Sequence, residues 1–189
     1  MTARRGALLL ALAASTAAGG VVATSHAATG AGRTTAFVSK EYSYSLDLPG
    51  SQARWLVEPA HVRWTTGSLQ PNVPQFDTLT DLASGRFFIL GARKQPGRST
   101  LADWTRYFLS SRALACRRTS RISHSTLAGV AARSYTFRCF DAYGIGIDAV
   151  HGRRGYFMVL SIHGTAGTVG SAHRHEFEAA RRSFRFGAH

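Results

Sequence analysis

The fold is decided by Ile145-Gly-Ile-Asp-Ala-Val-His151 and Tyr156-Phe-Met-Val-Leu-Ser-Ile-His163, two stretches joined by Gly-Arg-Arg-Gly. Apolar side chains recur at every second position, which is typical of β-strands that bury a face. We expect these stretches to form an antiparallel hairpin around a four-residue loop, 152–155. This loop length sets a register in which six apolar residues lie on one face. A slip by one residue would move them to different faces, so their agreement supports the register. The facing pairs are Ala149 with Met158, Ile147 with Leu160, and Ile145 with Ile162.

Further strand patterns lie on either side, bounded by turn residues such as Pro49-Gly50. We predict strands over 42–48, 54–58, 61–65, 86–92, 122–126 and 133–140. The segments 54–58 and 61–65 should pair as a short hairpin that carries Trp55 and Trp64. We expect a loop over 67–80, where the pattern lapses. Turns are expected at 127–130 and 141–144.

Two amphipathic helices complete the pattern. The first begins near Ser99 and runs to about Ala115, because a hydroxyl cap is followed by Asp103 at the positive end of the helix dipole. The second begins at Ser171. Each carries apolar side chains on one face: Leu101, Trp104 and Phe108 in the first helix, and Phe177, Ala180 and Phe184 in the second.

The N-terminus has the three parts of a secretory signal peptide. Arg4 and Arg5 precede an apolar run, and Ser25-His26-Ala27 fits a small-x-small cleavage site. We therefore expect a signal peptide over 1–27, a flexible leader over 28–36 and one domain over 37–187, secreted or otherwise extracytoplasmic. Retention of the first segment as a membrane anchor is the alternative. No transmembrane span is expected in the mature chain.

Export also bears on the two cysteines. Cys116 and Cys139 are the only cysteines of the chain, and compartments outside the cytoplasm favour disulfides. Two cysteines alone do not make a structural zinc site, which needs four nitrogen or sulfur ligands. We predict a disulfide that ties the end of the first helix to the sheet.

Several of these patterns, taken in order, resemble the PsbP-like superfamily, which includes the extrinsic PsbP subunit of photosystem II and many small exported bacterial proteins. They are the strand ending in Pro49-Gly50, the helix start 99–104, the turn 127–132, the strand 155–160 and the last helix, 176–184. The resemblance covers about 37–186. It implies an α+β fold, with a central antiparallel sheet covered by helices, and a non-enzymatic role. No family site residue carries over, because these motifs are positions that form the fold.

Charge is the strongest clue to a partner. Lys and Arg number 23 against 10 Asp and Glu, for a formal net charge of +13. This excess permits an anionic partner such as a lipid surface, an envelope polymer or an acidic protein, and it also suits a solvated basic surface. Arg117, Arg118 and Arg121 form the densest basic cluster and are the candidate ligand-binding residues; 153–154 and 181–182 are smaller clusters. Nucleic acid is disfavoured, since the aromatic residues occupy core spacings.

No catalytic constellation is present in the sequence. There is no Gly-x-Ser-x-Gly elbow, phosphate-binding glycine-rich loop or dinucleotide fingerprint. Asp77 and Asp81 are the closest pair of acids outside the helices, and capping or solvation explains both. His173 and His175 lack a His-Glu-x-x-His pattern and are expected to be exposed. We therefore predict no catalytic residue, no metal and no cofactor.

These observations favour a non-catalytic binding or accessory module of the cell envelope. Its ligand is expected to be either an apolar molecule, such as a lipid, or an anionic envelope polymer. An exported hydrolase with an unrecognised site and a docking protein for an acidic partner are the alternatives. A carrier needs an apolar cavity. The hydrolase requires Asp77, Asp81, His163 and His173 to meet in space. Docking to an acidic partner predicts binding that weakens with salt.

Overall fold

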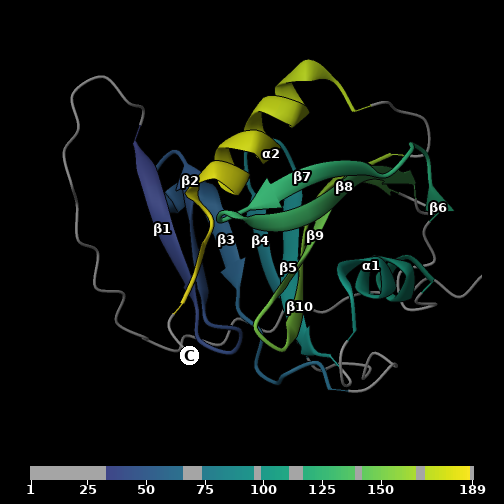
Figure 1. Cartoon of the computed structure of the whole chain (residues 1–189). Coiled ribbons are helices and arrows are strands. Elements are labelled where there is room, and N and C mark those ends of the chain that lie inside the picture. The colour runs from purple at the N-terminus through teal and green to yellow at the C-terminus, as the bar shows by residue number, and fades with distance from the viewer. Residues whose placement is uncertain are drawn as a thin grey trace, which may run out of the picture.

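The computed structural model describes residues 33–65, 74–95, 99–110, 117–138, 142–164 and 169–187. These residues form an α+β fold with two antiparallel sheets and two α-helices (Figure 1). The larger sheet has eight strands, with the order β3-β4-β5-β10-β9-β8-β6 and with β7 also paired to β8. Its strands are β3 (Trp55–Glu58), β4 (Asp77–Asp81), β5 (Phe87–Lys94), β6 (Arg117–Arg118), β7 (Ser123–Leu127), β8 (Val130–Arg138), β9 (Ala142–His151) and β10 (Arg154–His163).

The smaller sheet has three strands, in the order β1-β2-β11. They are β1 (Thr34–Ser39), β2 (Tyr44–Pro49) and β11 (Arg185–Phe186). A 3-10 turn, η1 (Gln52–Arg54), leads into β3, and the helices are α1 (Leu101–Ser110) and α2 (Ser171–Ser183). Neither helix of the described chain has the length and apolar character of a membrane span.

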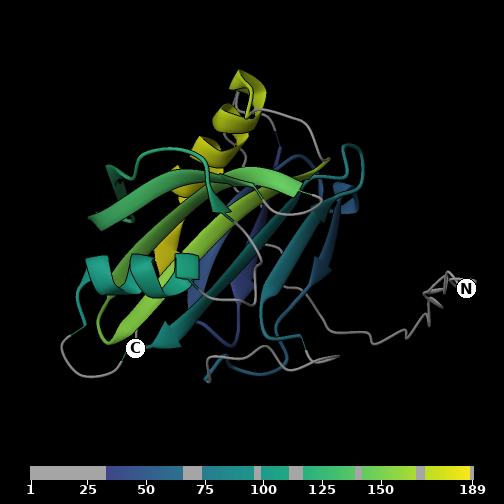
Figure 2. The same cartoon turned by 90° about the vertical axis from the view of Figure 1, so that its right-hand side faces the viewer.

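The large sheet separates two hydrophobic cores. Figure 2 shows α1 in front of the sheet and α2 behind it. Met158 and Leu160 of β10 point toward α2 and the small sheet, whereas Phe157 and Val159 point toward α1. Strand β10 is therefore buried on both faces, and the sheet needs a layer on each side.

The predicted helices are confirmed. A capping box begins α1, in which the hydroxyl and the amide of Thr100 bond to the Asp103 carboxylate and the Asp103 amide donates to the Thr100 hydroxyl. In α2, Phe177 and Ala180 are buried as expected, and Phe184 ends the helix. The expected end of the first helix, near Ala115, lies outside the described residues.

The hairpin of β9 and β10 is confirmed, but its register differs by two residues from the predicted one. Tyr156 faces Ala149, so the loop is only Gly152-Arg153 rather than 152–155. Gly152 adopts a φ of +59°, as the tight two-residue turns that match strand twist require. A shift by two residues leaves every side chain on its original face, so the predicted buried face is still correct.

The predicted hairpin of 54–58 with 61–65 is wrong. Strand β3 pairs with β4, which occupies part of the expected loop 67–80. The chain after Pro59 is held by separate hydrogen bonds instead of a ladder. The Ala60 amide donates to Asp77 Oδ1 at 2.8 Å, the His61 amide to the Pro74 carbonyl at 2.9 Å, and the Trp64 amide to the Tyr42 hydroxyl at 3.0 Å. Hydrogen bonds of this kind leave no periodic pattern in the sequence.

Pairing between distant segments also produces strand structure that was not predicted. Strand β1 (Thr34–Ser39) was not expected at all, and it begins inside the expected leader 28–36, where its backbone pairs with β2 over 44–49. Strand β9 begins at Ala142, inside the expected turn 141–144, where Ala142 faces His163 of β10. In both places the pairing partner comes from another segment and produces strand structure beyond the local pattern.

Gly155 of β10 is the position against which the Trp104 ring of α1 packs. A Cβ atom at this position would lie 2.3 Å from the Trp104 ring. The Trp104 indole N–H donates to the Tyr156 carbonyl at 2.8 Å, so the ring cannot move away without losing a buried hydrogen bond. Glycine at position 155 therefore lets the indole ring lie directly on the sheet.

We predict that Gly155→Ala lowers the free energy of unfolding by about 1–3 kcal/mol or more, because the added methyl overpacks the Trp104 contact. Urea unfolding followed by tryptophan fluorescence measures the change. Gly170→Ala is the matched control: a Cβ at position 170 has its nearest neighbour at 3.9 Å, and we expect a loss of no more than about 1 kcal/mol. Equal losses in both variants would contradict the proposed packing.

Candidate binding site

The candidate arginines lie at one edge of the large sheet. Arg117 and Arg118 form β6, which pairs with Arg138 and Phe137 of β8 and ends the sheet. Successive side chains of a strand point to opposite faces, so this edge presents a guanidinium group to each side. Arg121 follows in the loop to β7 and is also exposed. We call Arg117, Arg118 and Arg121 the basic edge.

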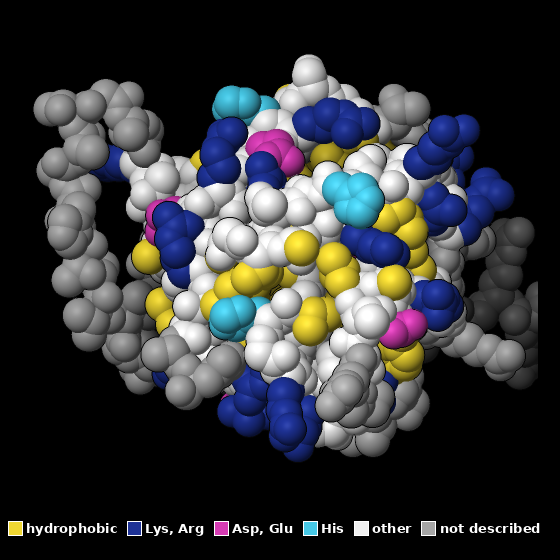
Figure 3. Space-filling model, viewed as in Figure 1, with side chains coloured by type: hydrophobic (Ala, Val, Ile, Leu, Met, Phe, Trp, Pro, Cys, Tyr) yellow, Lys and Arg dark blue, Asp and Glu magenta, His cyan; other side chains and the backbone are white. Residues whose placement is uncertain are grey.

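Hydrogen bonds to β8 fix the backbone of the basic edge. The Thr119 amide donates to the Thr136 carbonyl at 2.8 Å, and the Thr136 amide donates to the Ser120 hydroxyl at 2.8 Å. Arg118 donates to the Ser120 carbonyl. Within the described chain, none of the three arginines of the basic edge forms an ion pair with a carboxylate. Figure 3 shows Lys and Arg side chains gathered on the right, where Figure 1 places β6.

The scarcity of acids at the surface has a structural cause. Of the acidic residues that the structure describes, four are buried, namely Asp77, Asp81, Asp148 and Glu176. Arginines, in contrast, lie mainly at exposed or half-buried positions. The surface is therefore more basic than the composition alone indicates, which favours anionic partners.

Asp81 is the centre of a buried charge network. Arg54 donates to both of its carboxylate oxygens, at 2.9 and 2.6 Å, and the Ser84 hydroxyl donates at 2.6 Å. These bonds hold the pKa of Asp81 well below its ordinary value. Arg86 links this carboxylate to Glu176 of α2, at 3.5 and 2.8 Å. The network joins α2 to the β4–β5 turn, so it serves the fold.

Asp77 also serves the fold. The Tyr44 hydroxyl donates to Asp77 Oδ2 at 2.5 Å, while Oδ1 accepts the Ala60 amide. Burial and the neighbouring Asp77 carboxylate raise the pKa of Tyr44 well above its ordinary value. Asp77 thus connects the small sheet to the large one, and neither oxygen is directed at solvent.

The four residues that the hydrolase alternative requires do not meet. Asp77 and Asp81 lie at opposite ends of β4, about 13 Å apart along the strand. The His163 ring packs on Phe87, with 4.9 Å between centroids, and the His173 ring lies 6.5 Å from the ring of Tyr143. Among the described residues, no three His, Cys, Asp or Glu side chains form a group able to hold a metal ion.

The interior under α1 is filled by aromatic side chains. Phe108 stacks on Phe157 at 4.4 Å between centroids, and Trp64 packs edge-on against Phe76 and Phe157 at 5.3 and 6.1 Å. Trp104 is completely buried between them and the sheet. Because these rings contact one another, an apolar ligand could enter this part of the described interior only by separating them.

The other sequence-predicted residues lie away from the basic edge. Arg181 pairs with Glu178 at 2.6 Å and donates to the Thr126 carbonyl, so it fastens α2 to β7. Arg153 and Arg154 lie at the β9–β10 turn. Cys116 and Cys139 are outside the described residues, and their disulfide stays a prediction. Their chain neighbours Arg117 and Arg138 face each other in the β6–β8 pairing.

Sequence analysis did not single out Asp148, a buried carboxyl beneath α1. The Tyr135 hydroxyl donates to its Oδ1 at 3.0 Å, and its Oδ2 makes no hydrogen bond in the described part of the chain. Burial raises the pKa of Asp148 to about 8, although the bond from Tyr135, the neighbouring Thr105 hydroxyl and the charge of Arg133 oppose the rise. The sequence does carry one indication of this buried carboxyl, since Asp148 is an acidic residue within the largely apolar stretch 145–151.

Asp148 should make stability depend on pH. Its pKa is about 8 in the fold against 3.8 ordinarily, so the folded protein holds an extra proton between these values. The stabilisation is complete below about pH 4 and is lost as the pH rises toward 8, at up to about 1.4 kcal/mol per pH unit. Asp148→Asn removes this dependence. Between pH 5 and pH 8, the free energy of unfolding of the variant, measured in urea, should therefore rise relative to that of the wild type.

Asp47→Asn is the matched control for this experiment, because it makes the same chemical change at an exposed position. We expect the difference in unfolding free energy between Asp47→Asn and the wild type to stay nearly constant over the same pH range. A constant difference for Asp148→Asn as well would contradict a buried, protonated Asp148.

Comparison with known proteins finds the fold among solved structures. No family model matches the chain, and no curated protein matches it by sequence. The chain is similar to cyanobacterial PsbP (CyanoP) from Synechocystis sp. PCC 6803, with a TM-score of 0.55, 12% identity and coverage of 86% of this chain and 98% of that one. It is also similar to LpqN, "involved in cell envelope biogenesis of Mycobacterium tuberculosis", with a TM-score of 0.50, 12% identity and coverage of 82% and 91%. The chain therefore has a PsbP-like fold, as the sequence resemblance implied.

Proposed function

We propose that this protein with a PsbP-like fold is a non-catalytic accessory module of the cell envelope, and that the basic edge binds an anionic envelope polymer. The observation that carries the proposal is the set of three exposed arginines at the sheet edge, none of which forms an ion pair with a carboxylate in the described chain. Arginine suits phosphate and carboxylate groups because its planar guanidinium donates two parallel hydrogen bonds.

Three further observations support this choice. The fold is similar to that of LpqN, a protein involved in cell envelope biogenesis of Mycobacterium tuberculosis. The aromatic packing under α1 disfavours a carrier of apolar ligands. The separation of Asp77 from Asp81, together with their hydrogen bonds inside the fold, disfavours the hydrolase.

The shape of the basic edge favours a polymer. Its guanidinium groups extend from an edge strand and the following loop, at exposed positions, so they suit repeated charges along an extended chain. Such binding is mainly electrostatic and should weaken steeply with salt. An extracytoplasmic location, in agreement with the predicted signal peptide 1–27, would place the protein beside such polymers.

The proposal predicts that the purified full chain binds a poly(glycerol phosphate) chain and that the triple variant Arg117→Gln/Arg118→Gln/Arg121→Gln loses at least about tenfold in affinity. Isothermal titration calorimetry at several salt concentrations measures the affinity and its salt dependence. The control triple variant Arg33→Gln/Arg174→Gln/Arg182→Gln removes the same charge at exposed positions and should change the affinity by less than about threefold.

Two outcomes would overturn the proposal. Equal losses in both triple variants would mean that net charge alone attracts the polymer. Tighter binding to an acidic polypeptide such as poly-L-glutamate than to poly(glycerol phosphate), with the same loss in the first variant, would identify the basic edge as a dock for an acidic protein.

A further inference from the structure

The tip of the β9–β10 hairpin carries a row of basic side chains. Arg154, the first residue of β10, faces His151 of β9 on one side and Lys94 of β5 on the other. Directly opposed residues of antiparallel strands point to the same face of a sheet. Three basic side chains therefore lie side by side across three strands, and we call Lys94, Arg154 and His151 the basic row.

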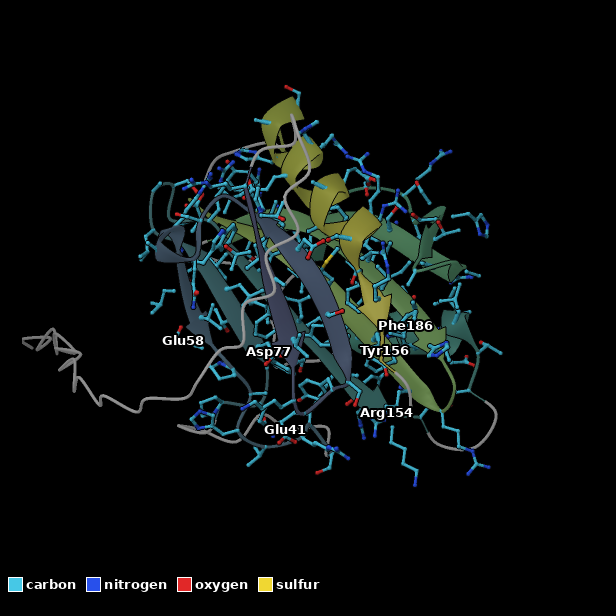
Figure 4. The ribbon with its side chains drawn as sticks, turned by 90° about the vertical axis from the view of Figure 1, so that its left-hand side faces the viewer. Glu41, Glu58, Asp77, Arg154, Tyr156 and Phe186 are labelled. Atoms are coloured by element: carbon cyan, nitrogen blue, oxygen red, sulfur yellow. The ribbon has the colours of Figure 1, made fainter. Side chains whose placement is uncertain are left out.

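Two members of the basic row, Lys94 and Arg154, have no acidic partner among the described residues. Like charges directly opposite each other in a sheet destabilise the pair, yet neither Lys94 nor Arg154 forms an ion pair with a carboxylate in the described chain. Glu41, labelled on the same lower part of the molecule in Figure 4, pairs with Arg63 at 3.4 Å instead. A bound anion would supply the missing negative charge.

Arg154 also has a donor with no acceptor. Its Nη1 is buried from solvent and makes no hydrogen bond in the described part of the chain. A buried donor without an acceptor costs free energy, most of all on a charged group. The guanidinium charge also acts on the Tyr156 hydroxyl, whose pKa burial raises and Arg154 opposes. The Arg154 guanidinium therefore lies near the Tyr156 hydroxyl, whose side chain is buried.

Aromatic contacts hold the surroundings of Arg154 in place. Phe186 of β11 stacks on the His151 ring at 4.3 Å between centroids and packs edge-on against Tyr156 at 4.8 Å. Figure 4 shows Arg154, Tyr156 and Phe186 next to one another. On the opposite face, Gly155 packs against Trp104, and the Gln95 amide donates to the Arg153 carbonyl at 2.8 Å. Packing on both faces of the sheet therefore fixes the backbone that carries the basic row.

We propose that the basic row is a binding site for a phosphate group, with Arg154 and Lys94 as the main ligands. A phosphate offers acceptor oxygens in several directions, so one group can accept from the guanidinium of β10 and from the ammonium of β5 together. The site goes beyond the proposed function, because it uses other residues. Tyr143, beside the basic edge, and His151 are eight positions apart along β9, or about 26 Å.

Titration of the full chain with inorganic phosphate, followed by two-dimensional amide NMR, tests the proposal. We expect saturable shifts of the amides of Lys94 and Gly155, and a loss of about tenfold or more in affinity for Arg154→Gln. Arg153→Gln is the matched control, since it removes the same charge from the exposed turn of the same hairpin. It should weaken phosphate binding by less than about threefold.

A second variant protects the test against misfolding. Lys94→Gln changes an exposed side chain and should also weaken phosphate binding by several-fold, and dispersed amide spectra check the fold of each variant. Shifts that do not saturate would overturn the site, and so would equal losses for Arg153→Gln and Arg154→Gln. Because the basic edge is intact in these variants, failure here is distinguishable from failure of the proposed function.

The same variants identify the source of the phosphate group. Phosphatidylglycerol vesicles present it as a lipid headgroup, poly(glycerol phosphate) presents it in a polymer, and inorganic phosphate presents it free. Each source that binds the wild type at least about tenfold more tightly than Arg154→Gln supports the site and names its ligand. Retention of full affinity for all three sources by Arg154→Gln would overturn it.

Discussion

The rest of the structure depends on the burial of β10 on both of its faces. Its side chains are apolar in both directions, with Met158 and Leu160 on one face and Phe157 and Val159 on the other. A sheet whose centre is apolar on both sides needs a layer on each, because apolar surface left in water costs about 25 cal/mol per Å². The helix α1 supplies one layer, and α2 with the small sheet supplies the other.

This two-sided burial also explains where the acids lie. Asp77 and Asp81 lie at the two ends of the same buried face of β4. Each carboxylate accepts a hydrogen bond from a segment outside β4, Asp77 from Tyr44 and Asp81 from Arg54. Asp148 lies on the other face under α1, where its carboxyl is held protonated by burial. Because acids are used inside the fold, the arginines of the surface are left with few carboxylate partners, and the protein presents separate basic clusters at the edge and at the hairpin tip.

Local patterns predicted the elements well where a segment carries its own signal. The Thr100–Asp103 capping box and the apolar spacing of α2 were visible in the sequence and are present in the structure. The register of β9 and β10 was wrong by two residues, since Gly152-Arg153 alone forms the turn. The pairing of β3 with β4 could not be predicted from local periodicity, because it joins residues far apart in the chain, such as Trp55 and Asp81.

For the candidate site, the sequence supplied the arginine cluster 117–121, whose residue types and spacing require no knowledge of the fold. It could not place Lys94 opposite Arg154, because sixty residues separate them along the chain and only strand pairing brings them together. By itself, the sequence determined the α+β class, the two amphipathic helices and the apolar face of the central hairpin, all of which follow from local periodicity. The tertiary structure decided which strands pair, which acids are buried and which basic side chains share a surface, because these depend on contacts between segments far apart in sequence.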